Sequence, residues 1–165
     1  MATIQGGIMQ ERMDYGAVAP GAEDAMRGLQ HYVDRSGLEP GLLELVKTRA
    51  SQLNGCAYCV DMHTKDARAG GESEQRLYAL PVWRETPFFT DRERAALAWT
   101  ESVTLLPGNG VSDEQYREAG RHFSERQLVD LTMAVIAING WNRLSVTFRT
   151  VPGTYRPAPT GGTAR

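Results

Sequence analysis

The sequence predicts a single all-α domain, and three observations indicate this fold class. Helix signals recur along the chain, as apolar residues at helical spacing, Ser or Thr at capping positions, and Gly or Pro at the breaks. No segment shows the sustained alternation of polar and apolar residues that is typical of a strand. The length of 165 residues suits one ordinary domain with a real core.

The first part of the chain predicts three consecutive helices. Residues 20–37 have Pro near the start, Gly at the end and apolar side chains at helical spacing between them. Residues 39–55 follow, with Pro40 suited to a first turn and Asn54-Gly55 suited to a stop. The third helix is expected from about Cys56 to Gly70-Gly71.

The second part predicts a short helical piece over residues 73–80, a loop over 81–89 and then further helices. Three capping-box patterns mark the helix starts, namely Thr90 with Glu93, Ser112 with Gln115, and Ser124 with Gln127. The helix after Thr90 covers 91–106, and "PGNG" over 107–110 breaks the chain. The last helix is expected from Glu125 to about Arg149.

The expected organisation is an N-terminal segment over residues 1–14, a helical domain over 15–150 and a flexible tail over 151–165. The tail is rich in Pro, Gly and Thr, a composition that buries little apolar surface. No internal repeat is visible.

Composition excludes several classes of protein. The formal net charge of −2 provides no basic surplus for binding nucleic acid, so we expect no nucleic-acid partner. The longest apolar run, Met133 to Ile138, is far shorter than the ~20 residues of a membrane span. The N-terminus lacks the basic start and apolar core of a signal peptide. We therefore expect a cytoplasmic protein, where a CxxC pair is typical of redox or metal chemistry.

The chemistry is concentrated in the stretch "ELVKTRASQLNGCAYCVDMH", residues 44–63. It contains the only two cysteines, Cys56 and Cys59, and His63 follows four residues later. On a helical wheel these three side chains share one stripe, and the i,i+3 and i,i+4 spacings make them neighbours. A helix start lowers the pKa of a thiol, and a histidine can take its proton. A second thiol beside them completes a candidate redox centre.

Glu44 is the fourth candidate, and its placement is open. If the helices on either side of Asn54-Gly55 fold back on each other, Glu44 and His63 lie ~16 Å and ~12 Å from the turn, at similar heights. A carboxylate–imidazole contact then becomes feasible. However, Glu44 shares a helix face with Thr48 and Ser51, opposite the apolar face, and periodicity alone places that polar face at the surface.

A zinc site is the competing hypothesis for the cysteines. Structural zinc takes four ligands, usually from two paired clusters. Here Cys56, Cys59 and His63 have no second pair, and the fourth ligand would have to be Glu44 or come from another subunit. We favour the redox reading and expect neither a metal nor a cofactor.

The spacing of these four residues resembles the core motif of a known family. Eleven residues separate Glu44 from Cys56, two separate the cysteines, and three separate Cys59 from His63. The pattern is similar to that of AhpD-like alkylhydroperoxidases in the carboxymuconolactone decarboxylase superfamily. The flanks "LLELVKTRASQLNGCAYCVDMHTKDAR", "VWRETPFFTDRERAALAWTE" and "INGWNRLSVTFR" extend the resemblance over residues 15–149.

The resemblance implies an AhpD-like helical bundle that assembles into trimers or hexamers and reduces hydroperoxides. Cys59 would be the peroxidatic cysteine and Cys56 the resolving one, with Glu44 and His63 relaying the proton. The implied partners are a hydroperoxide substrate and an external dithiol reductant. The alternative is a lactone decarboxylase-type, or a non-peroxidase redox or oligomeric, member of the same superfamily.

One position departs from the family pattern, and several other residues were weighed for a role. Well-studied members have a histidine between the cysteines where this chain has Tyr58, whose phenol cannot relay protons at neutral pH. The wheel directs Tyr58 away from the site, so we expect it to pack. His31 and His122 are expected at the surface without a role. Trp141 could line the site or a subunit interface, and core packing is favoured.

Overall fold

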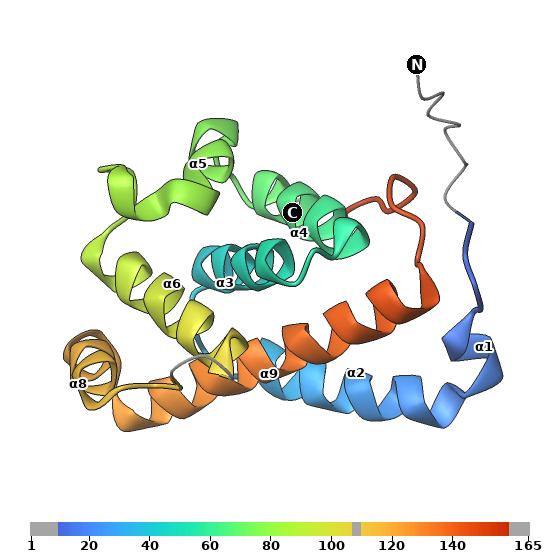
Figure 1. Cartoon of the computed structure of the whole chain (residues 1–165), viewed down its shortest axis with the longest axis horizontal. Helices are drawn as coiled ribbons and strands as arrows, with labels where there is room; N and C mark the ends of the chain where they lie inside the picture. Colours follow the sequence, from blue (N-terminus) through green and yellow to red (C-terminus); the bar gives the residue numbers. More distant parts are fainter. Residues whose placement is uncertain (1–9, 107–109, 159–165) are drawn as a thin grey trace, which may run out of the picture.

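The computed structural model describes residues 10–106 and 110–158, and within these ranges the regular structure is entirely helical (Figure 1). The fold class predicted from the sequence is therefore confirmed. In chain order the elements are α1 (Tyr15–Val18), α2 (Pro20–Asp34), α3 (Pro40–Leu53), α4 (Ala57–Ala69), α5 (Glu74–Ala79), the 3₁₀ helix η1 (Leu80–Glu85), α6 (Asp91–Thr104), α8 (Asp113–His122) and α9 (Glu125–Phe148).

The predicted capping boxes are present at the starts of α6, α8 and α9. In each one a Ser or Thr hydroxyl accepts the N–H of the third helical residue, whose side chain accepts the N–H of the cap in return. The pairs are Thr90 with Glu93, Ser112 with Gln115, and Ser124 with Gln127. These local patterns therefore fix three helix starts. The predicted break at 107–110 lies, except for Gly110, outside the described residues.

Two local features differ from the expectations. Asp14 caps a short helix, α1, that the sequence pattern did not predict. The segment 81–89, expected as a loop, is largely taken up by η1, which buries Trp83 in the core. Phe89 is buried in the same apolar cluster as Trp83.

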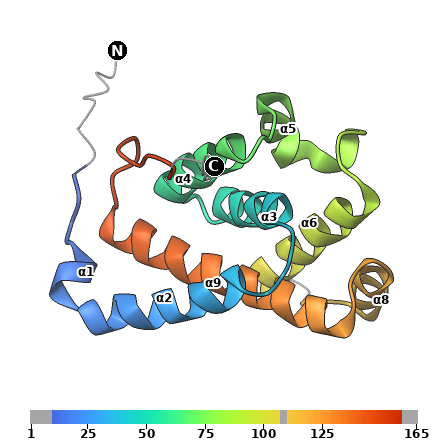
Figure 2. The same cartoon turned by 180° about the vertical axis from the view of Figure 1, so that it is seen from behind.

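Helix α3 lies at the centre of the molecule, and this position explains the rest of the architecture. It packs against α4 on one side, α6 on another and α9 on a third, while α2 runs alongside α9 (Figures 1 and 2). The main apolar cluster joins α2, α3, α6, α8 and α9, and a second one lies under α5 and η1. A helix enclosed on three sides has no broad face left for water.

The turn between α3 and α4 is tied to α9 by side-chain amides, of which Asn142 is buried. Asn54 donates from Nδ2 to Oδ1 of Asn139 and of Asn142, both at 2.9 Å. Asn142 donates from its own Nδ2 to Ser51 Oγ at 2.9 Å. The turn itself uses Gly55 at φ +65°, a left-handed conformation that favours glycine. The predicted stop at Asn54-Gly55 is thus confirmed.

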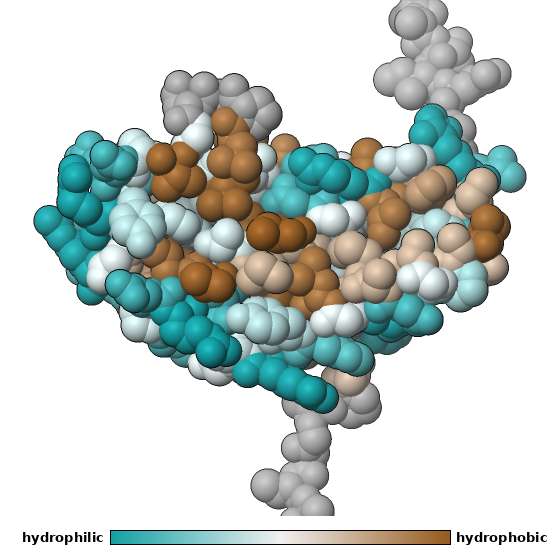
Figure 3. Space-filling model, turned by 90° about the horizontal axis from the view of Figure 1, so that it is seen from below, coloured by the Kyte–Doolittle hydropathy of each residue, from teal (hydrophilic) through white to brown (hydrophobic). Residues whose placement is uncertain are grey.

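The surface includes an apolar band on the face formed by α2 and α9 (Figure 3). On α9 the side chains of Val129 and Ile136 are 55% and 47% exposed. A shallow hollow of about 450 Å³ beside them is lined by Val103, Leu106 and Ile136, among others. Across residues 10–106 and 110–158, no helix combines the length and apolar character needed to cross a membrane.

The first eight residues of the predicted tail, 151–158, contain no helix and lie against α4 through hydrogen bonds. Gly153 donates its N–H to Asp61 Oδ2 at 2.9 Å, and the Tyr155 hydroxyl donates to Asp66 Oδ1 at 2.7 Å. This segment therefore covers part of the helix that carries the cysteines. The division of the chain at residues 15 and 150 stays a prediction.

Candidate functional site

The two cysteines form a disulfide at the start of α4. Cys56 is the residue that caps the helix, and its sulfur accepts the N–H of Cys59 at 3.3 Å. The Cα atoms are 5.3 Å apart, a separation typical of disulfides. The i,i+3 pair predicted to be adjacent is thus joined, because the cap position is free of the regular helical geometry.

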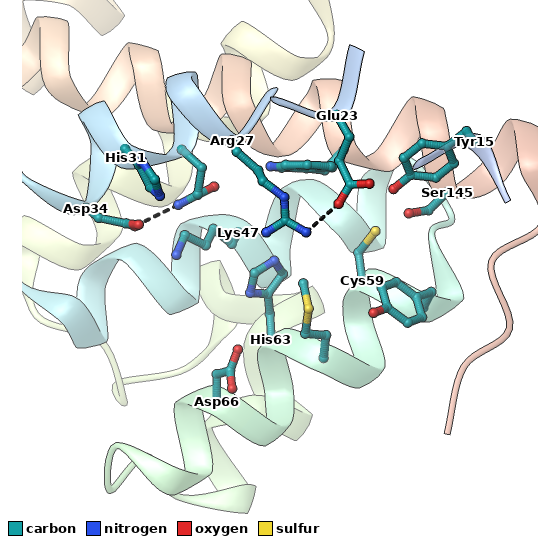
Figure 4. Close-up of a pocket in the computed structure, with 14 residues that line it drawn as sticks. Tyr15, Glu23, Arg27, His31, Asp34, Lys47, Cys59, His63, Asp66 and Ser145 are labelled. Atoms are coloured by element: carbon teal, nitrogen blue, oxygen red, sulfur yellow. Dashed lines mark hydrogen bonds and ion pairs between the residues drawn. The ribbon is translucent and has the colours of Figure 1, made fainter. Parts of the chain in front are cut away.

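The disulfide is buried, and one of its sulfurs faces a cavity. Cys56 and Cys59 are each 1% exposed and pack with Ala50 and Ile138. Cys59 lines a cavity of about 430 Å³ between α2 and α4, whereas Cys56 is not among the described residues that line it (Figure 4). A small molecule in this cavity would therefore meet Cys59.

His63 lies one turn along α4 from Cys59 and faces the same cavity (Figure 4). The ring is 6% exposed, and its Nδ1 lies 2.9 Å from Glu44 Oε2. A carboxylate on one ring nitrogen fixes the ring orientation and stabilises the protonated form. The pairing of Glu44 with His63 that antiparallel folding at Asn54-Gly55 suggested is therefore present.

Glu44 is itself held by two partners. Its second oxygen, Oε1, accepts a hydrogen bond from Lys47 Nζ at 2.9 Å. Burial on its own raises the pKa of Glu44, but the hydrogen bond and charge of His63, together with Lys47, outweigh it. The net pKa lies below the ordinary value, so Glu44 is an anion at neutral pH.

The polar face of α3, which periodicity placed at the surface, is in fact largely buried. Thr48 and Ser51, expected with Glu44 at the surface, are both 0% exposed. The polar face of α3 is covered because α4 and α9 pack on it. Glu44 therefore enters the site through the central position of α3, which the wheel alone could not indicate.

The far wall of the cavity is formed by α2, to which the sequence analysis assigned no role. Glu23, Arg27 and His31 project from one face of α2 toward α4, and Glu23 pairs with Arg27 (Figure 4). Their i,i+4 spacing is the signal that marks a shared face. His31 is exposed, as predicted, and it also lines the cavity.

Aromatic side chains form the apolar end of the cavity. Tyr58 and Trp141 line it and also pack beside the disulfide, so the packing role expected for both is combined with a place in the site. Tyr15 from α1 joins them. Burial, and then the negative charge of Glu23, raise the pKa of Tyr15, so its phenol remains protonated.

Three side chains near the cavity lie close enough together to be considered as metal ligands. Glu44, His63 and Asp66 each place one donor atom within 4.8 Å of the others. The Lys47 ammonium already occupies one Glu44 oxygen and repels a cation there. The zinc set that includes Cys56 and Cys59 does not fit the disulfide form, because zinc binds thiolates. The donor set therefore favours proton transfer over metal binding.

Comparison with families of known proteins gives a clear relationship. Residues 20–102 match the model of the carboxymuconolactone decarboxylase family. The chain is 44% identical over 138 residues to the uncharacterized protein YdfG of Bacillus subtilis, a match that covers 84% of this chain and 94% of YdfG.

Solved structures agree with this relationship. ATU0492 of Agrobacterium tumefaciens, a protein of unknown function with a proposed identity as the antioxidant defence protein AhpD, is 42% identical with a TM-score of 0.86, over 88% of this chain and all of that one. An uncharacterized peroxidase-related protein from Ralstonia eutropha, with an alkylhydroperoxidase AhpD core, shares the fold at 20% identity and a TM-score of 0.74, over 84% of this chain and 74% of its own. The chain is therefore an AhpD-like member of the carboxymuconolactone decarboxylase family.

Proposed function

We propose that this protein is a thiol-dependent alkyl hydroperoxide reductase in which Cys59 is the peroxidatic cysteine and Cys56 the resolving cysteine. The observation that carries the proposal is a Cys56–Cys59 disulfide at a helix start, where Cys59 and a Glu44-paired His63 face one cavity. The pair is the oxidised product that such a reaction leaves behind. Family membership and the antioxidant role proposed for ATU0492 support the same activity.

The assignment of Cys59 as the attacking thiol rests on its surroundings. It lies in the first turn of α4, where the helix dipole and free N–H groups favour a thiolate. That first turn has no acidic residue to neutralise the dipole. Cys59, and not Cys56, is among the described cavity-lining residues, so a hydroperoxide would reach it first.

The proposed reaction balances in three steps. His63 takes the proton of the Cys59 thiol, and the thiolate attacks the terminal peroxide oxygen, which breaks the O–O bond. His63 returns the proton to the departing alkoxide, so the products are an alcohol and a Cys59 sulfenic acid. The Cys56 thiol then condenses with the sulfenic acid, and water leaves as the disulfide forms. An external dithiol reduces the disulfide by exchange and is oxidised to its own disulfide.

Glu44 has a supporting role in this scheme. Its carboxylate stabilises the imidazolium that exists between the first and second proton transfers. Because its pKa is lowered, the carboxylate is charged throughout the neutral range. Lys47 holds the other oxygen and fixes the direction of the carboxylate.

The cavity favours an organic hydroperoxide over hydrogen peroxide alone. Its volume of about 430 Å³ exceeds what one small peroxide fills, and Tyr15, Tyr58, Met62 and Trp141 offer apolar contact. The same opening has to admit the reducing dithiol, since both sulfurs are otherwise buried. A reducing compartment such as the cytoplasm would supply that dithiol, and the cytoplasm is part of the proposal.

Assembly into a homo-oligomer, trimeric or hexameric by the family resemblance, is also proposed. The apolar band of Figure 3 supports it, since Val129 and Ile136 on α9 leave large side chains in water. The hollow between α6 and α9 gives a second copy a surface to pack against.

The test is a single-turnover reaction of the reduced protein with one equivalent of cumene hydroperoxide. We expect the loss of two thiols per chain, formation of one equivalent of alcohol, and a Cys56–Cys59 disulfide in the mass spectrum. Cys59→Ser should consume no peroxide. Alcohol formation without thiol loss, or activity of Cys59→Ser, would refute the proposed thiol mechanism. If the reduced protein formed no alcohol and kept both thiols, the decarboxylase-type alternative, which needs no dithiol, would be favoured.

A further inference from the structure

We infer that Asp66 is a second carboxylate acting on His63, and that Tyr155 of the C-terminal segment is the positioning residue that holds Asp66 in place. The inference extends the proposed function, because it assigns two further residues to the proton relay of the same site. Neither residue is part of the Glu44–Cys56–Cys59–His63 motif.

The first step is the geometry around the imidazole. Asp66 follows His63 by three residues on α4, so both side chains lie on one face of the helix. One carboxylate oxygen of Asp66 lies within 4.8 Å of a ring nitrogen of His63 and of an oxygen of Glu44. Figure 4 shows Asp66 below His63, on the side away from Arg27. The ring therefore lies close to two carboxylates from two helices.

The second step is the anchor on Asp66. The Tyr155 hydroxyl donates to Asp66 Oδ1 at 2.7 Å, across 89 residues of sequence. Two further hydrogen bonds join the backbone of the same segment to α4. Lys65 Nζ donates to the Tyr155 carbonyl at 3.2 Å, and the Gly153 N–H donates to Asp61 Oδ2. Three hydrogen bonds thus join the C-terminal segment, which contains no helix, to about one and a half turns of α4.

The protonation of Tyr155 supports this arrangement. Burial, then the hydrogen bond to Asp66 and the charges of Asp66 and Glu44, raise the pKa of Tyr155 far above its ordinary value. The phenol therefore stays a hydrogen-bond donor over the whole range in which the enzyme would work. A permanent donor on one oxygen of Asp66 keeps the orientation of that carboxylate constant.

The third step is the position of Asp66 between two cavities. It lines the cavity that holds Cys59 and His63, and it also lines a second cleft of about 430 Å³ between the start of α3 and the end of α4. Glu44 lines that second cleft as well. The two carboxylates thus separate the buried imidazole from a water-accessible space, which gives a proton a short way out of the site.

Other charged or titratable groups line the cavity of His63 or contact its lining residues, and they have to be separated from this effect. They come from α1 (Tyr15), from α2 (Glu23, Arg27, His31 and Asp34), from α3 (Glu44 and Lys47), from α4 (Tyr58 and Asp66) and from the C-terminal segment (Tyr155). The described residues of α9 that line the cavity, Trp141 and Ser145, carry no charge. A single substitution changes one of these groups and leaves the others in place, so it isolates the effect of that group on His63.

The experiment is an NMR titration of the His63 ring in the disulfide form of the full chain. This form has no thiol, so the titration midpoint reports only the groups around the ring. The chain has three histidines, and His63→Gln assigns the signal. We expect Asp66→Asn to move the midpoint to lower pH by about 1 unit, because a nearby anion is lost. Tyr155→Phe should move it in the same direction by about half as much.

A matched control is available on the surface. The Tyr78 hydroxyl donates to Glu74 Oε2 at 3.0 Å, which is the same pairing of phenol and carboxylate away from the site. Tyr78→Phe should leave the midpoint unchanged. Circular dichroism of each variant establishes that the helices are intact.

Two results would overturn the inference. An unchanged midpoint in Asp66→Asn removes Asp66 from the relay, and an unchanged or raised midpoint in Tyr155→Phe shows that Tyr155 does not hold the carboxylate toward the ring. In the reduced protein, the acid limb of the hydroperoxide pH–rate profile, which reports the base that has to be unprotonated, should move to lower pH in both variants. Absence of turnover in the wild type would refute the proposed function alone, since the NMR titration needs no substrate.

Discussion

Among the helix starts in the described part of the chain, two kinds differ in a way that separates stability from chemistry. Helices α6, α8 and α9 begin with a Ser or Thr hydroxyl cap, a reciprocal Glu or Gln, and an acidic residue in the first turn. Helix α4 begins with Cys56, whose sulfur is a poorer acceptor than an oxygen, and its first turn has no acidic residue. The three ordinary starts satisfy their N–H groups and dipole locally.

The start of α4 leaves its dipole available to a sulfur anion. An acidic residue in that turn would stabilise the helix, but it would also repel a thiolate at Cys59. The carboxylate nearest to this chemistry comes instead from α3, where Glu44 is directed at His63. The negative charge is thus placed where it would support His63 as the proposed base.

The largest effect should follow when the sulfur cap is replaced by an oxygen cap. Cys56→Ser gives α4 a hydroxyl cap, as α9 has, but it removes the proposed resolving thiol. We expect hydroperoxide consumption to stop after a single turnover, with a sulfenic acid trapped at Cys59. Dimedone labelling followed by mass spectrometry measures this. If Cys56→Ser blocked the first oxidation step instead, the roles of the two cysteines would be reversed.

The next effect concerns the carboxylate that α3 supplies. Glu44→Gln should slow the reaction at neutral pH and lower the free energy of unfolding by about 1.5–3 kcal/mol, since a charged hydrogen bond is lost. The folded pKa of Glu44 lies below its ordinary 4.5. Its stabilisation is therefore complete above that value and is lost as the pH falls through the folded pKa.

Urea unfolding of the disulfide form at pH 7, 5 and 3 measures this. The difference in the free energy of unfolding between wild type and Glu44→Gln should become smaller toward pH 3. Glu74→Gln, at a carboxylate that pairs with Arg68 at the surface, serves as the control and should change little. If this difference did not depend on pH, Glu44 would stabilise the fold through the packing of its side chain and not through its charge.

A smaller effect is expected at an ordinary start. Ser124→Ala removes the cap of α9, the longest helix in the described part of the chain, and should lower the free energy of unfolding by about 1 kcal/mol. Peroxide consumption per folded molecule should not change. A loss of activity at full folding would show that the two kinds of start are not independent.

The smallest effect compares two replacements at one position. In reduced protein, Cys56→Ser should be more stable than Cys56→Ala by about 0.5–1 kcal/mol, because a hydroxyl caps the helix and a methyl group does not. Urea midpoints of the two variants give the difference. Equal midpoints would mean that the N–H of Cys59 finds another acceptor.

The features that could be predicted from the sequence are those that depend on neighbouring residues in the chain. The capping boxes, the stop at Asn54-Gly55 and the adjacency of Cys56, Cys59 and His63 depend on residues a few positions apart, and all of them are present. The motif spacing also indicated the family. These features need no knowledge of how the helices pack.

What could not be predicted depends on packing at long range. The wheel placed Thr48 and Ser51 at the surface, because it assumes one buried face, whereas α3 is enclosed by three helices. The α2 wall of the cavity follows from the contact of α2 with α9. The contact of Tyr155 with Asp66 joins residues 89 positions apart, and nothing in either local sequence indicates it.

The amides around Asn54 have a consequence for the proposed redox cycle. Because Asn54 is bound to Asn139 and Asn142 of α9, the chain entering Cys56 is held by contacts that do not involve sulfur. When the disulfide opens, the backbone on that side keeps its position, and the two thiols remain within reach of each other. Under the proposed function, the return from disulfide to dithiol would then need no refolding step that could limit how quickly the protein recovers for the next oxidant.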